Sequence, residues 1–232
     1  MQDETRSDSA RREFLHTVLS GAALGVAAQA GLEMTYPARA QAQSQLTPDA
    51  ALQELLAGNE RFASNKMTSI EQDLAMLKAR TVEKQEPFAA VLSCADSRVP
   101  VELLFDQTIG QIFVTRVAGN IVSPEIIASL EYGVAVLGVK TLLVLGHTNC
   151  GAVKAAMKAD PVPGQISTLY TQLRRAVEQS HGDLNQAIIA NAKIQADLLS
   201  SSSPVIRGAV KDHKLKMAAG VYNLATGKVT LS

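Results

Sequence analysis

The stretch Phe88-Ala89-Ala90-Val91-Leu92-Ser93 is a short, uninterrupted apolar run that leads directly into Cys94. Runs of this length without polar alternation are typical of strands that are buried on both faces of a parallel sheet. Residues 112–115 and 141–145 repeat the pattern, and residues 123–137 between them have the apolar spacing of a helix. Alternation of buried strands with helices predicts an α/β fold with a mainly parallel central β-sheet flanked by helices.

Further elements follow from the same kinds of signal. Thr47-Pro48 begins a helix, with Thr as the N-cap and Pro in the first turn. Other helices are expected over residues 74–80, after Cys150, and over residues 183–200. Two short runs, Pro204-Val205-Ile206 and Gly220-Val221-Tyr222-Asn223-Leu224, have the composition of strands.

The composition is that of an ordinary globular protein. The 232 residues include 22 basic and 22 acidic side chains, and 47% are hydrophobic. This balance provides no electrostatic field for nucleic acid or an anionic membrane, so neither partner is expected. The length predicts one catalytic domain, which we assign to residues 43–232.

Residues 1–42 differ from the rest and have the parts of an export signal. Arg11-Arg12 precede an Ala- and Gly-rich apolar segment, and small-residue sites follow at Ala38-Arg39-Ala40 and Ala40-Gln41-Ala42. The paired arginines favour the Tat route and a periplasmic or otherwise exported protein. A membrane anchor or a disordered tail is the alternative, but the apolar run is short and broken by glycine. No stable membrane span is therefore expected after removal of the signal.

Two short runs contain the residue types of a zinc site. Cys94 directly follows the first strand, and His147 and Cys150 follow the third. Thiolate and imidazole are ligands that zinc prefers, and three protein ligands leave a fourth position for water. Ligands of parallel sheets gather beyond the carboxyl ends of the strands, where both runs lie.

A disulfide is the usual expectation for two cysteines in an exported protein. Each of the two cysteines of this chain, Cys94 and Cys150, instead stands in a run with metal-ligand spacing. We therefore expect free thiols, and a disulfide between them would exclude the zinc site.

Asp96 and Arg98 accompany Cys94 and are not needed for metal binding alone. A bidentate Arg–carboxylate pair would keep Asp96 ionised and fix its direction. Asp96 could then accept a hydrogen bond from zinc-bound hydroxide and orient it.

These runs resemble those of the β-class carbonic anhydrases. The similarity is carried by Ser93–Pro100, Ala118-Gly119-Asn120, Gly146-His147 and Cys150–Val153. The resemblance implies one Zn²⁺ per subunit and reversible hydration of CO₂ to bicarbonate and a proton. It further implies an alternative role for Asp96, which could become the fourth zinc ligand if Arg98 releases it. It also implies a homodimer or higher homo-oligomer, and a substrate-binding role for Gln85, nine residues before Cys94.

Three other functions are compatible with the same residues. Hydrolysis of CS₂ or COS would use the same zinc hydroxide. A non-catalytic zinc-binding protein would keep the scaffold, although it would not need the pair of Asp96 and Arg98. A cysteine nucleophile, Cys94 with His147, is the third, but two thiols and one imidazole fit a metal better.

Overall fold

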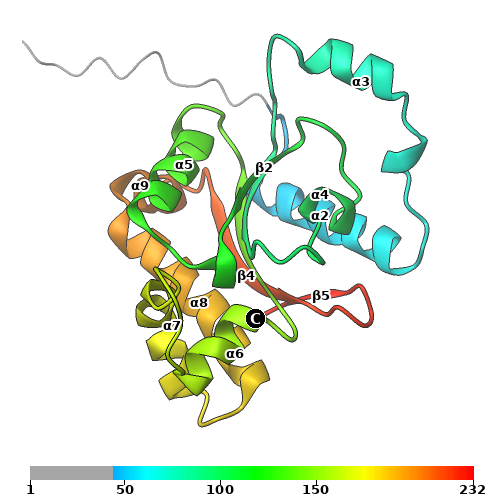
Figure 1. Cartoon of the computed structure of the whole chain (residues 1–232). Coiled ribbons are helices and arrows are strands. Elements are labelled where there is room, and N and C mark those ends of the chain that lie inside the picture. The colour runs from blue at the N-terminus through cyan, green and yellow to red at the C-terminus, as the bar shows by residue number, and fades with distance from the viewer. Residues whose placement is uncertain (1–43) are drawn as a thin grey trace, which may run out of the picture. The chain divides into compact units, whose positions relative to one another are not determined.

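A five-stranded sheet forms the centre of the computed structural model, which describes residues 44–232. The strands follow the order β2-β1-β3-β4-β5 (Figure 1). Four of them are parallel: β1 (Ala89–Ser93), β2 (Ile112–Arg116), β3 (Thr141–His147) and β4 (Lys216–Tyr222). The short β5 (Val229–Leu231) is antiparallel to β4. The expected mainly parallel α/β sheet is confirmed.

Eight helices and two 3-10 turns connect the strands within residues 44–232. The helices are α2 (Pro48–Ala63), α3 (Leu74–Thr81), α4 (Val101–Leu104), α5 (Pro124–Ala135), α6 (Gly151–Lys158), α7 (Thr168–Gln179), α8 (Leu184–Ser202) and α9 (Pro204–Lys211); the turns are η1 (Ser69–Glu71) and η2 (Ala118–Asn120). As predicted, Thr47 is the N-cap of α2, and its hydroxyl accepts a hydrogen bond from the backbone N–H of Ala50. Such an N-cap hydrogen bond satisfies one of the backbone N–H groups that have no partner within the first turn of a helix.

Successive residues of β1 point to opposite faces of the sheet, and both faces are covered. Ala89 and Val91 pack in one core cluster with α2 and α4, whereas Ala90 and Leu92 pack in a second cluster with α5, α8 and α9. Figure 1 shows these two groups of helices on opposite sides of the sheet. All five residues of β1 are buried, which explains why this stretch is apolar without alternation.

The register of the strands brings their carboxyl ends together. Ser93 of β1 lies beside Leu145 of β3 on one side and beside Arg116 of β2 on the other. The loops that leave β1, β2 and β3 therefore begin within a few residues of one another at the same edge of the sheet.

Several assignments made from the sequence need correction or addition. The strand expected over residues 220–224 begins earlier and ends at Tyr222, as β4, and the short α4 was not expected. Residues 204–206 form the start of helix α9, so the expected strand is wrong. The hydroxyl of Ser203 accepts a hydrogen bond from the backbone N–H of Ile206, and Pro204 occupies the first turn. A three-residue apolar run cannot distinguish a strand from a helix start, and the capping interaction decides for the helix. Helix α7 was not expected from the sequence; it buries only Leu173 and Ala176.

The export signal expected over residues 1–42 lies outside the described residues. Among the helices of residues 44–232, none combines the length and the apolar character needed to cross a membrane.

Candidate metal centre

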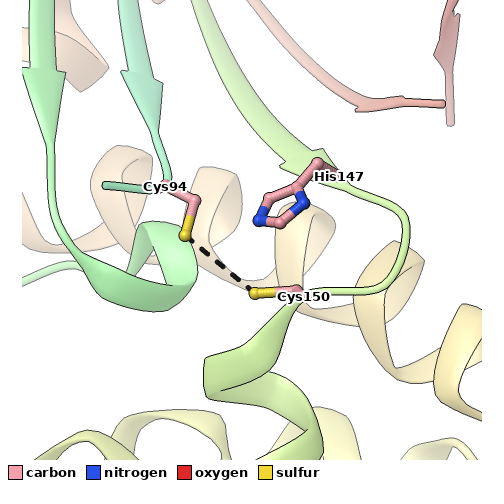
Figure 2. Close-up of side chains that lie close together, drawn as sticks. All are labelled: Cys94, His147 and Cys150. Atoms are coloured by element: carbon pink, nitrogen blue, oxygen red, sulfur yellow. Dashed lines mark hydrogen bonds between the residues drawn. The ribbon is translucent and has the colours of Figure 1, made fainter. Parts of the chain in front are cut away.

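Three side chains that could bind a metal converge at the carboxyl edge of the sheet. Cys94 follows β1, His147 is the last residue of β3, and Cys150 is the N-cap of α6. All three are buried, and their possible ligand atoms lie within 4.8 Å of one another. Figure 2 shows the two sulfur atoms and the imidazole ring facing a common point.

The geometry of these atoms fits a tetrahedral zinc ion. The Sγ atoms of Cys94 and Cys150 are 4.0 Å apart. Two zinc–sulfur bonds of about 2.3 Å at a tetrahedral angle place the sulfurs roughly 3.8 Å apart. His147 Nδ1 lies 3.0 Å from the carbonyl oxygen of Thr148, whereas the buried Nε2 has no hydrogen-bond partner. An unpartnered buried ring nitrogen is costly, and a metal ion would satisfy it.

Both cysteines are free, as the sequence analysis expected. A hydrogen bond between the two sulfurs lowers the pKa of Cys94, and the backbone N–H of Gly119 also donates to Cys94 Sγ at 3.3 Å. Because Cys94 carries the negative charge, its hydrogen bond to Cys150 raises the pKa of the second thiol. The buried pair thus already favours one thiolate, and binding of a cation would release the remaining thiol proton.

The expected pair of Asp96 and Arg98 is formed beside this cluster. Arg98 Nε donates to Asp96 Oδ1 at 2.9 Å, and Arg98 Nη2 donates to Asp96 Oδ2 at 2.7 Å. The hydrogen bonds from Arg98 hold the pKa of Asp96 below its ordinary value. Asp96 Oδ2 also lies 3.8 Å from His147 Nε2, which places an ionised carboxylate at the edge of the metal cluster.

Comparison with known proteins identifies the family to which a chain with this arrangement of residues belongs. The family model described as carbonic anhydrase matches residues 89–229. The structure of Coccomyxa β-carbonic anhydrase in complex with acetazolamide aligns with a TM-score of 0.61 and 28% identity, over 78% of this chain and 85% of that one. The chain belongs to the β-class carbonic anhydrase family.

Two curated relatives agree with this family assignment. Carbonic anhydrase from Pseudomonas aeruginosa is 30% identical over 193 residues, which cover 77% of this chain and 86% of that protein. Carbonic anhydrase 2 from Mycobacterium tuberculosis is 43% identical over 112 residues, or 48% of this chain. The latter match spans about half of the mycobacterial protein, 54% of its length.

The part of the chain that matches the family model contains most of the predicted site. Cys94, Asp96, Arg98, His147 and Cys150 all fall within residues 89–229. The structure brings these five residues together, which agrees with the sequence analysis.

Gln85 lies elsewhere in the chain. It precedes β1, so it is at the opposite end of this strand from Cys94. It is exposed and lines a surface cavity of about 660 Å³ together with Val82, Tyr132 and Val136. Within one chain Gln85 is not part of the metal cluster, and its predicted role depends on a second subunit.

Arg116 is a site residue whose contacts the sequence analysis did not anticipate. Its Nε donates to the carbonyl oxygen of Cys94 at 2.9 Å, and its Nη2 donates to that of Asp96 at 2.6 Å. Arg116 ends β2 beside Ser93, so the parallel register brings its guanidinium to the Cys94–Asp96 backbone. A basic residue at the end of a predicted strand was the only sequence signal for this role.

Proposed function

We propose that this protein catalyses the zinc-dependent reversible hydration of CO₂ to bicarbonate and a proton. One observation carries the proposal: the buried cluster of Cys94, His147 and Cys150 lies directly beside an Asp96 that Arg98 keeps ionised. Metal binding alone would require the first three residues and not the pair. The family assignment supports the same reaction.

The residues of the site would have two roles, to bind the metal and to orient the attacking oxygen. Cys94, His147 and Cys150 would hold one Zn²⁺ per subunit, and the metal would lower the pKa of a bound water to about 7. The Asp96 carboxylate is held in place by two side-chain hydrogen bonds from Arg98, but it retains lone pairs that can accept a further hydrogen bond. Asp96 would therefore accept a hydrogen bond from the attacking hydroxide and so direct the lone pair of its oxygen at CO₂.

The pair of Asp96 and Arg98 also offers a second, resting state of the site. The Arg98 side chain is 48% exposed, so water could solvate its guanidinium if it turned away from Asp96. Asp96, once released, has an oxygen 3.8 Å from His147 Nε2 and could move to become the fourth zinc ligand. That movement would occupy the position needed by water and close the site.

The activity test combines metal analysis with stopped-flow CO₂ hydration. Purified protein should contain one zinc per chain and hydrate CO₂ rapidly, and chelation should abolish the activity. Cys150→Ser removes one soft ligand and should lose both zinc and activity. A Cys150→Ser protein with normal hydration would refute the ligand assignment. Activity toward CS₂ or COS without CO₂ hydration would instead support the alternative hydrolase, and zinc without either activity would support a binding protein.

We also propose that the protein forms a homodimer through the surface around β2. Strand β2 is an edge of the sheet, and Ile70, Leu74, Leu103 and Ile109 are exposed apolar side chains along a groove of about 600 Å³. Exposed apolar patches of this kind are typical of protein interfaces. The cavity that contains Gln85 shares Ile109 with this groove, so a second copy docked here would meet Gln85.

Sedimentation velocity tests the dimer. The wild-type protein is expected to sediment as a dimer or a larger oligomer, and Ile109→Asp should shift it toward monomer because it buries a charge in the interface. Ile166→Asp places the same charge on an apolar side chain of similar exposure outside this surface and should leave the oligomer intact. A monomeric wild type at micromolar concentration would refute the interface.

Export by the Tat route remains part of the proposal and is supported by the Arg11-Arg12 signal pattern of residues 1–42. Replacement of both arginines with lysine should retain the protein in the cytoplasm, as judged by cell fractionation.

A further inference from the structure

Two buried amide side chains of helix α8 contact the loop that follows β2. Asn191 and Gln195 are four residues apart, so they lie on the same face of the helix, and each is only 1% exposed. Burial of such groups costs free energy unless their polar atoms find partners. All four amide nitrogen and oxygen atoms of this pair are hydrogen-bonded.

The hydrogen bonds of the pair are directed at the loop backbone. Asn191 Nδ2 donates to the carbonyl oxygen of Gly119 at 2.8 Å, and Gln195 Oε1 accepts from the backbone N–H of Val122 at 2.8 Å. Gln195 Nε2 donates to Asn191 Oδ1 at 3.1 Å and to the carbonyl oxygen of Gln172 at 3.3 Å. The two amides therefore fix both ends of the segment from Gly119 to Val122.

This segment contacts the sulfur of a metal ligand. The N–H of Gly119 points at Cys94 Sγ at 3.3 Å, and Gly119 has a left-handed φ of +76°. A Cβ added to Gly119 would lie 3.3 Å from atoms of Ala152 and Leu173, so the loop passes close to α6 and α7. An N–H held in this direction stabilises the negative charge of a thiolate ligand.

We infer that Asn191 and Gln195 are positioning residues of the metal centre. They hold the Gly119 loop so that its N–H remains directed at Cys94 Sγ, and they thereby increase the affinity of the site for zinc. The inference rests on the proposed zinc site, because it concerns how tightly the three ligands bind the metal. The side-chain hydrogen bonds of both residues go to the loop, to Gln172 and to each other rather than to the ligands, so their effect passes through the loop.

The test measures zinc affinity by competition with a chromophoric chelator. Asn191→Leu and Gln195→Met keep the side-chain volume but remove the hydrogen bonds, and each should weaken zinc binding about 10-fold. The double variant should lose little more than either single variant, because both act through the same loop. In the Co²⁺-substituted protein, the thiolate-to-metal charge-transfer band should shift in both variants.

Leu199→Ala is the matched control. Leu199 lies on the same helix and is fully buried, but it packs in the core cluster with Leu92 and Val144, apart from Cys94. This variant should lower Tm at least as much as Asn191→Leu while leaving zinc affinity and the Co²⁺ band unchanged. A general loss of stability would lower zinc affinity in Leu199→Ala as well as in Asn191→Leu, so it would not produce this difference in zinc affinity between the two variants.

The outcomes separate this inference from the proposed function. A wild-type protein that binds no zinc would overturn both. Wild-type binding of zinc with equal affinity in Asn191→Leu and Gln195→Met would overturn only the positioning role, as would an equal loss of affinity in Leu199→Ala. If Asn191→Leu does not fold, Asn191→Ala leaves space for water at the Gly119 carbonyl and provides the same comparison.

Discussion

Replacement of Asp106 with Asn should destabilise the protein at neutral pH and lose its effect in acid. The Asp106 side chain is fully buried and accepts hydrogen bonds from Arg61 Nε at 2.5 Å, from the backbone N–H of Ser69 at 2.8 Å, and from the N–H and hydroxyl of Thr68. In the Asp106→Asn variant an amide NH₂ would face the Arg61 donor, so one charge-assisted bond is lost while the backbone N–H groups keep an acceptor. Such a loss at a buried carboxylate costs about 3 kcal/mol in the free energy of unfolding. For a domain of this size, Tm should fall by roughly 6–12 °C.

The pH dependence of this effect follows from the pKa of Asp106. Burial alone would raise that pKa, but the hydrogen bonds from Arg61, Ser69 and Thr68 outweigh it and hold the pKa below its ordinary value. The stabilisation is therefore present above the unfolded-state pKa of about 3.9, and it is lost as the pH falls below that value toward the folded pKa.

Urea unfolding followed by circular dichroism at pH 7, 5 and 3.5 measures the difference in the free energy of unfolding between wild type and Asp106→Asn. The difference should be full at pH 7 and at pH 5 and should begin to shrink at pH 3.5. Glu86→Gln removes an exposed carboxylate that pairs with Lys84 and should change stability by less than about 0.5 kcal/mol at every pH. A difference for Asp106→Asn as small as that control, or one that grows in acid, would refute the reasoning.

Two further substitutions test the site and the packing. Asp96→Asn should lower CO₂ hydration about 100-fold with zinc content unchanged, because the ionised acceptor is lost, whereas the exposed Asp160→Asn should have wild-type rates in the same stopped-flow assay. Zinc loss in Asp96→Asn would contradict the proposed division of roles. Gly58→Ala should cost at least about 2 kcal/mol in urea unfolding, because the added Cβ would lie 1.8 Å from the carbonyl oxygen of Phe105. Gly208→Ala meets nothing within 4 Å and should stabilise helix α9 by about 0.5–1 kcal/mol, so equal effects of the two would contradict the packing argument.

Much of the fold could be predicted because its signals are local. The buried strands β1 and β3 are continuous apolar runs, and α2 and α5 begin at capping residues followed by proline. The signal is ambiguous at residues 204–206, where a short apolar run fits a strand or a helix start and the Ser203 cap decides for the helix. Helix α7 was missed although Leu169, Leu173, Ala176 and Val177 have helical spacing, because most of its residues are polar and only Leu173 and Ala176 are buried.

The metal ligands could be predicted because zinc selects residue types that are rare in this chain. With two cysteines in all, one directly after an apolar run and the other five residues beyond one, the set of Cys94, His147 and Cys150 had few competitors. Gln85 shows the limit of this reasoning, since the single chain places it at the other end of β1 and only a second subunit could bring it to a metal site.

The sequence by itself determined strands β1, β2 and β3, the ligand types and the pair of Asp96 and Arg98, because each depends on neighbouring residues or on side-chain chemistry. Only the tertiary structure decided that Arg116 holds the Cys94 loop and that Asn191 holds Gly119. These contacts join segments that are 22 and 72 residues apart. Their geometry depends on the register of the parallel strands and on the packing of α8, which no local pattern of residues encodes.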